Sequence, residues 1–200
     1  MQASGKAAIL FVLLMTCLSL AAFAPQAEPK AKLDRREARN AFELLNKIRE
    51  NPAPYARELK MPGNLKISNG PLVWNKVLAR AAEAKALDMA NEQYFAHVDK
   101  QGYGMNYHIH QEGYRLIPEF LRKRSDNTFE SIAAGPESGE AAIRMLIIDD
   151  NTPGKGHRDH LLGINKWNRS LVDIGIGFVH CESGCRFKSY VSVIIAKHDW

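Results

Sequence analysis

The sequence predicts an α+β domain in which helices pack on a sheet. Stripes of apolar residues at helical spacing recur between residues 34 and 148, and two β-rich runs around a short turn follow near the end of the chain. About 175 residues remain after a predicted signal peptide, which suits one domain with a real core. The chain contains no internal repeat and no low-complexity tract.

Residues 1–24 have the pattern of a signal peptide. Lys6 provides a short positive region, an apolar run follows from Ala7 to Leu20, and small residues precede a polar stretch. We therefore expect a secreted protein, located in a periplasm or outside the cell, with no membrane span after signal cleavage.

Three alternatives for this segment stay open. Cleavage at the predicted boundary would leave Pro25 first in the mature chain, a poor position for signal peptidases, so Ala22 and Ala27 are other candidate ends. An uncleaved anchor is possible because residues 7–24 just reach the length of a membrane-spanning helix. A lipid anchor at Cys17 fits poorly, since apolar sequence continues beyond it.

The formal net charge of +5 falls by one when Lys6 is removed. Basic residues are scattered, apart from Arg115 and the run Arg122, Lys123 and Arg124. This distribution predicts at most weak attraction to anionic surfaces. No pattern of interleaved aromatic and basic residues is present, so we expect no nucleic-acid partner.

The first helix is expected after a charged linker, Glu28 to Lys32, with residues 25–40 forming the linker and the start of the helix. Asp34 is a suitable N-cap. One apolar stripe follows at helical spacing, formed by Ala38, Ala41, Leu45 and Ile48. Pro52 and Pro54 prevent the helix from continuing.

Further elements follow in order. Asn75 can cap a second helix with an apolar stripe formed by Leu78, Ala82, Ala86 and Met89, and its small alanines would allow close packing on a sheet. Residues 105–111 predict a short helix, and residues 114–128 an exposed loop. Ser138 opens another helix, which ends at Asp149 and Asp150.

Cys181 and Cys185 are the two cysteines of the mature chain. They flank the turn Glu182–Gly184 between two β-rich runs, so we expect a hairpin clamped by a disulfide in an oxidising compartment. A metal-binding pair or free thiols are the alternative, but a C-x-x-x-C pattern alone is weak evidence for a metal.

His97, Glu130 and His157 are the strongest candidates for chemistry. Both histidines lie beside loops, where functional groups are often held. Glu130 lies in an apolar run and needs a partner or a wet cavity. Two imidazoles with one or two carboxylates suit zinc or a similar divalent ion. Alternatively, Glu130 could pair with an arginine and His97 with Asp99.

Other polar residues carry weaker signals. His157 and His160 would share a helical face, but H-x-x-H without a carboxylate is common by chance. His108 and His110 converge only if their segment is extended. No nucleophile motif surrounds Ser131, and no phosphate-cradling glycine pattern occurs.

The order of several motifs resembles the CAP superfamily of cysteine-rich secretory, antigen 5 and pathogenesis-related proteins, in its bacterial SCP-like form. These motifs are LLNKIRENP, PLVWNKVLARAAEAKALDMA, YFAHVDKQG, FESIAAG, GHRDHLL and VDIGIGF. The resemblance implies a domain over residues 41–198. It also implies a three-layer α-β-α sandwich with an antiparallel central sheet.

The same resemblance implies an open cleft with two histidines and two acidic residues, which holds a divalent metal in some members. By position these are His97, Glu130 and His157. The fourth residue is Asp149 or Asp150, where many relatives have a longer glutamate. His160 is then expected beside the cleft or in solvent.

Two functions are compatible with this pattern. The first is an exported binding module, whose cleft holds a divalent metal or small ligand and whose loops contact a lipid or a cell-surface polymer. Its predicted partner surface is the segment GYRLIPEFLRKR, with Arg115, Arg122, Lys123 and Arg124. The alternative is a metal-dependent hydrolase using the same cleft. A purely structural domain is a third possibility.

Overall fold

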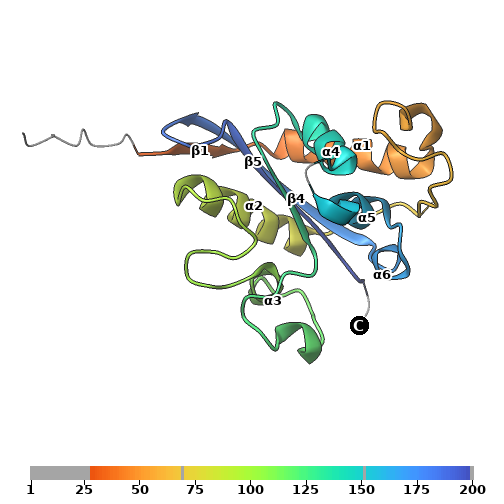
Figure 1. Cartoon of the computed structure of the whole chain (residues 1–200). Helices are drawn as coiled ribbons and strands as arrows, with labels where there is room; N and C mark the ends of the chain where they lie inside the picture. Colours follow the sequence, from red (N-terminus) through yellow and green to blue (C-terminus); the bar gives the residue numbers. More distant parts are fainter. Residues whose placement is uncertain (1–27, 69, 151, 199–200) are drawn as a thin grey trace, which may run out of the picture.

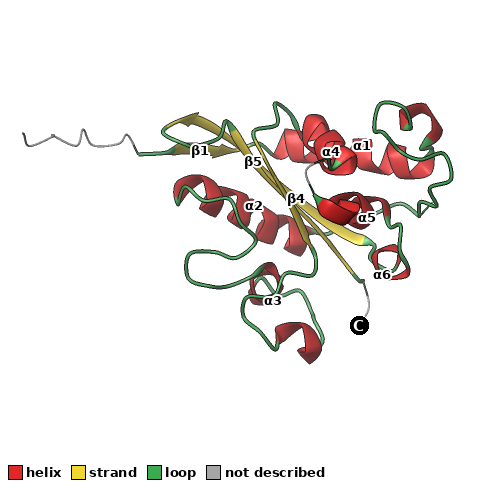
Figure 2. Cartoon of the chain, in the orientation of Figure 1, coloured by secondary structure: helices red, strands yellow, loops and turns green. Residues whose placement is uncertain are grey.

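A computed structural model of the chain describes residues 28–68, 70–150 and 152–198. The predicted signal peptide, residues 1–24, lies outside the described residues. A sheet runs through the middle of the molecule and helices cover both of its faces (Figure 1, Figure 2). None of the described helices is both long and apolar enough to cross a bilayer.

The sheet has the strand order β1-β4-β5-β3, and every neighbouring pair in that path is antiparallel. A fifth strand, β2, pairs in parallel with β4 over two residues. The strands are β1 (Lys30–Leu33), β2 (Val73–Trp74), β3 (Glu130–Ala134), β4 (Asp173–Ser183) and β5 (Ser189–Ala196).

The helices form the two outer layers. They are α1 (Arg35–Glu50), α2 (Lys76–Asn91), α3 (Met105–Gln111), α4 (Gly139–Ile148), α5 (Gly156–Leu162) and α6 (Lys166–Arg169), with short 3-10 turns η1 (Ala53–Tyr55), η2 (Pro118–Leu121) and η3 (Pro153–Lys155). Helices α1, α4 and α5 lie on one side of the sheet and α2 on the other (Figure 1). This confirms the predicted α+β sandwich with an antiparallel central sheet.

Capping side chains fix the starts of the long helices. Asp34 accepts hydrogen bonds from the backbone N–H groups of Arg36 and Glu37, each at 3.0 Å. Asn75 accepts from the second and third residues of α2 at 2.9 and 3.2 Å. Ser138 caps α4 in the same way. All three caps were predicted, because unpaired N–H groups at a helix start require such acceptors.

Two segments differ from their predictions. Residues 30–33, which include the end of the predicted charged linker, form β1, since pairing with β4 supplies partners for their backbone groups. The loop at 114–128 is only partly exposed: Tyr114 and Leu116 are buried, and Phe120 packs 5.2 Å from Phe129 between ring centroids. Its apolar residues reach the core. The domain boundaries at residues 25 and 41 stay predictions.

Close packing of α2 on the sheet depends on two glycines of β4. A Cβ atom added at Gly175 would lie 2.1 Å from the backbone of Leu78, and one at Gly177 would lie 2.2 Å from the backbone of Ala82. Backbone atoms cannot move aside as a flexible side chain can. The glycines therefore set the spacing between the sheet and α2. A side chain of α2 also holds the backbone on one side of the functional site.

Replacing Gly177 with alanine should lower the free energy of unfolding by about 2 kcal/mol or more, because the new methyl group forces α2 away from β4. Denaturant titration of the purified protein measures this change. Gly63→Ala is the matched control, since a Cβ atom at Gly63 meets nothing within 4 Å. Equal stability of the two variants would contradict the packing described here.

Candidate functional site

His97 and His157 line one cavity of about 290 Å³, although they lie far apart in the sequence. The segment after α2 supplies His97, β3 supplies Glu130, and the start of α5 supplies His157. The remaining lining residues are Asn127, Thr128, Ser131, Thr152, Gly156, His160, Trp167 and Asn168. The structure thus brings together the three residues that the sequence singled out.

Glu130 is a fully buried carboxylate at the start of β3. Its Oε2 lies 2.9 Å from Nδ1 of His97, and the side-chain hydroxyl of Ser192 donates to its Oε1 at 2.7 Å. Each carboxylate oxygen therefore has a partner, as a buried charge requires. His97 keeps 38% of its side chain exposed, so this pair connects the core to the cavity.

Asp149 forms a second pair of the same kind. Its Oδ1 lies 2.8 Å from Nδ1 of His157, and its Oδ2 accepts from the backbone N–H of His157 at 2.9 Å. Burial alone would raise the pKa of this carboxyl group. Hydrogen bonds from Thr152 and His157 outweigh that effect, so the pKa lies below its ordinary value.

The structure also decides which aspartate pairs with the cavity residue His157. Asp149 ends α4 with φ of 50°, a left-handed conformation that aspartate tolerates better than most residues. That turn directs Asp149 inward, where it is 4% exposed. Asp150 instead points outward and pairs with Lys60 and Lys155.

These pairs select the tautomer of each neutral imidazole. An ionised carboxylate can only accept a hydrogen bond, so Nδ1 of each neutral ring must carry the proton. Nε2 of His97 and of His157 then has a free lone pair, which is the arrangement that metal-binding histidines adopt. Within the described residues, no three His, Cys, Asp or Glu side chains form a group able to hold a metal ion.

His160 is neither a ligand of this kind nor solvent-facing. It is 7% exposed, and its Nδ1 lies 2.8 Å from Oγ of Ser131. Of the two expected positions, His160 takes the one beside the cleft, because α5 turns this side chain toward the sheet. Burial lowers the pKa of His160 to about 4. Ser131 is itself only 1% exposed, which argues against a role as a nucleophile.

A buried lysine on α2 holds the backbone of His97 in place. Nζ of Lys85 donates to the backbone carbonyl of His97 at 3.1 Å and to the hydroxyl of Tyr94 at 2.9 Å. Lys85 is 3% exposed, and burial lowers the pKa of its amine. Sequence reasoning missed this residue, since a lysine on a helix is normally solvated.

Other predicted contacts resolve as follows. Asp99 does not pair with His97 but with His108, whose Nε2 lies 2.9 Å away. His108 and His110 do not converge, because their segment is helix α3. Cys181 and Cys185 form the expected disulfide, clamping the β4–β5 hairpin. The predicted partner-surface residues Arg115, Arg122, Lys123 and Arg124 are all exposed.

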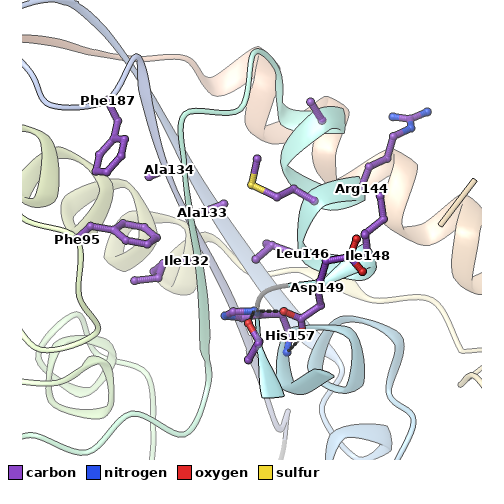
Figure 3. Close-up of a pocket in the computed structure, with 14 residues that line it drawn as sticks. Phe95, Ile132, Ala133, Ala134, Arg144, Leu146, Ile148, Asp149, His157 and Phe187 are labelled. Carbon is purple, nitrogen blue, oxygen red and sulfur yellow. Dashed lines mark hydrogen bonds and ion pairs between the residues drawn. The ribbon is translucent and has the colours of Figure 1, made fainter. Parts of the chain in front are cut away.

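An apolar groove of about 640 Å³ adjoins the cavity and shares Thr152 and His157 with it, while Asp149 lines only the groove (Figure 3). Its other lining residues are Phe95, Ile132, Ala133, Ala134, Ala141, Arg144, Met145, Leu146, Ile148, Asp150 and Phe187. The polar cavity and the apolar groove therefore meet at the His157–Asp149 pair.

Comparison with known proteins agrees with the fold and with the motif order. The chain matches the CAP family, described as the cysteine-rich secretory protein family, over residues 42–195. Because this match spans most of the sequence, the chain belongs to that family. No curated protein matches it at a significant level.

One similar solved structure is an extracellular protein containing a SCP domain from Bacillus anthracis str. Ames. The two share 21% sequence identity with a TM-score of 0.51, and the alignment covers 82% of this chain and 41% of that one. At this identity the likeness shows the fold alone. The present chain corresponds to less than half of that protein.

The buried His160 predicts a pH-dependent stability. Its pKa is about 4 in the folded chain and about 6.5 when unfolded, so between these values only the unfolded state binds the proton. This contribution to stability is present above pH 6.5 and is lost as the pH falls toward 4. Its size is on the order of 3 kcal/mol.

Denaturant titration at pH 7 and at pH 4.5 of the wild type and of His160→Gln measures this contribution. The loss of unfolding free energy on acidification should be smaller in the variant, since glutamine does not titrate. An identical loss in both proteins would show that His160 is not buried in its neutral form.

Proposed function

We propose that this protein is an exported CAP-domain binding module whose cavity holds a divalent metal ion such as zinc. The carrying observation is the pair of His–carboxylate contacts on one cavity, each with Nδ1 on the carboxylate and Nε2 left available. Carboxylates in such contacts orient the imidazole and raise its basicity toward a metal.

The donor set fits a weakly held ion rather than a permanent structural metal. His97 and His157 would supply the two nitrogen ligands, while Glu130 and Asp149 are occupied in orienting them. Structural zinc sites normally have four protein ligands and catalytic sites three. With two imidazole ligands, water or a bound small ligand would supply most of the ion's coordination. The ion would in turn attract such a small ligand by its positive charge.

The predicted signal peptide and the disulfide support a role outside the cytoplasm. A bridge between Cys181 and Cys185 persists in oxidising compartments and is uncommon in reducing ones. The exposed basic residues Arg115, Arg122, Lys123 and Arg124 remain the proposed contact surface for a lipid or a cell-surface polymer.

Zinc binding to the purified mature protein should be stoichiometric and should weaken at least about tenfold in His97→Ala or His157→Ala, because each variant removes one of two nitrogen ligands. Isothermal titration calorimetry measures the affinity. Lowering the pH should weaken binding further, since the ligand nitrogen must be unprotonated.

His108→Ala is the matched control: this histidine also pairs with a buried aspartate, but it lies outside the cavity. It should leave zinc affinity unchanged. If the wild type binds no zinc, or if His108→Ala weakens binding as much as the cavity variants do, the proposal fails. The metal-dependent hydrolase stays an alternative prediction that uses the same two imidazoles.

A further inference from the structure

Strand β3 lies at one end of the strand order, so one of its edges is unpaired within the described sheet. Its register with β5 shows which residues use that edge. The N–H of Ile195 donates to the carbonyl of Phe129, and the N–H of Gly135 donates to the carbonyl of Ser189. Because hydrogen-bonding residues alternate in an antiparallel pair, Ser131 and Ala133 also bond to β5.

The backbone groups of Glu130, Ile132 and Ala134 therefore point to the free edge. The side chain of Asn127 satisfies the first of these, since its amide accepts from the N–H of Glu130 at 3.2 Å and donates to its carbonyl at 3.3 Å. Asn127 thus imitates a neighbouring strand at one position. Ile132 and Ala134 are left with two N–H donors and two carbonyl acceptors for which the described part of the chain provides no hydrogen-bond partner.

This open edge is the floor of the apolar groove (Figure 3). Phe95 and Phe187 form one wall, with ring centroids 5.9 Å apart. Met145 and Leu146 of α4 form the opposite wall. Phe95 and Met145 are 40% and 46% exposed, which is high for large apolar side chains.

Within the described residues, the edge also lacks three features that protect free strands from pairing, namely a lysine, a proline and a bulge. Sheet edges are normally blocked by a lysine, a proline, a bulge or a covering segment. The sequence of β3 is ESIAA, and its pairing with β5 is regular throughout. Its one acidic side chain is buried on His97 and Ser192 rather than displayed at the edge.

Charge complementarity along the edge selects the occupant. The partial charges of N–H and C=O groups recur every second residue, roughly 6.6 Å apart, a spacing that another extended peptide matches. A lipid chain would fill the apolar walls but leave the four backbone groups desolvated and unpaired, which is unfavourable.

We propose that the groove binds an extended peptide segment of a partner protein, which adds to the sheet as a strand beside β3. Alternate side chains of this peptide, apolar at every second position, lie against the Phe95–Phe187 wall or against the Met145–Leu146 wall. The end of the peptide lies at the His157–Asp149 pair, where groove and cavity meet. Docking in this way does not require a metal ion.

A set of capped octapeptides with valine, leucine or phenylalanine at every second position and serine or lysine between them is the probe. Titration into the 15N-labelled mature protein without metal should slow amide hydrogen exchange at Ile132 and Ala134. Exchange at Ser131 and Ala133 should change little, since β5 already protects those amides. Binding without new protection at Ile132 and Ala134 would overturn the proposal.

N-methylation separates strand addition from apolar contact. Methyl groups on the alternate peptide nitrogens that face β3 should weaken binding at least about tenfold, because two hydrogen bonds are lost. Methyl groups on the intervening nitrogens should leave binding unchanged. If both series bind equally, or if only a fatty-acid probe binds, the groove recognises apolar groups rather than an added strand, and the proposal fails.

Variants of the protein provide an independent test. Ala134→Pro removes one outward N–H without breaking a bond to β5, and should weaken peptide binding about tenfold. Met145→Ala should weaken it about threefold or more through lost contact. Val73→Ala, another exposed apolar residue outside the groove, is the matched control and should have no effect. Unchanged affinity in both groove variants would contradict the proposal, and zinc titration of the same proteins reports on the metal site separately.

Discussion

The site depends on two buried carboxylates, because the buried oxygens of Glu130 and Asp149 require close hydrogen-bond partners. Each is paired with Nδ1 of a partly exposed imidazole, and these contacts fix the orientation of both rings. The rest of the fold serves this arrangement. Strand β3 places Glu130, the left-handed end of α4 places Asp149, and Lys85 holds the loop that carries His97.

The sheet connects this polar cavity with the apolar groove. Strand β3 contributes a buried carboxylate at its start and an open backbone edge farther along, so one short strand takes part in both sites. Tight packing of α2 against Gly175 and Gly177 covers a face of the sheet at close range. A ligand in the cavity and a peptide in the groove would both contact His157. We therefore expect the binding of one to change the affinity for the other.

Much of the fold was predictable because its signals are local. Caps at Asp34, Asn75 and Ser138 and the apolar stripes behind them depend on residues a few positions apart. The three site residues His97, Glu130 and His157 followed from the order of motifs and from the cost of burying a glutamate in an apolar run. The disulfide followed from two cysteines at a hairpin turn.

The remainder depended on long-range geometry. Strand β3 escaped prediction because it is nearly all buried and lacks alternation. The left-handed backbone turn at Asp149 alone decides that Asp149, and not Asp150, is the buried aspartate. The direction of α5 alone decides that His160 is buried. Lys85 and Ser192 belong to the site through tertiary contacts alone. No spacing rule in the sequence reveals such partners.

Imidazole 15N chemical shifts measured by NMR near pH 8 test the central claim most directly. The account predicts that His97 and His157 both carry the proton on Nδ1 and leave Nε2 unprotonated, and that Glu130→Gln and Asp149→Asn each disturb this state only in the paired ring. Protons on Nε2 in either wild-type ring would contradict the two His–carboxylate contacts on which the site rests.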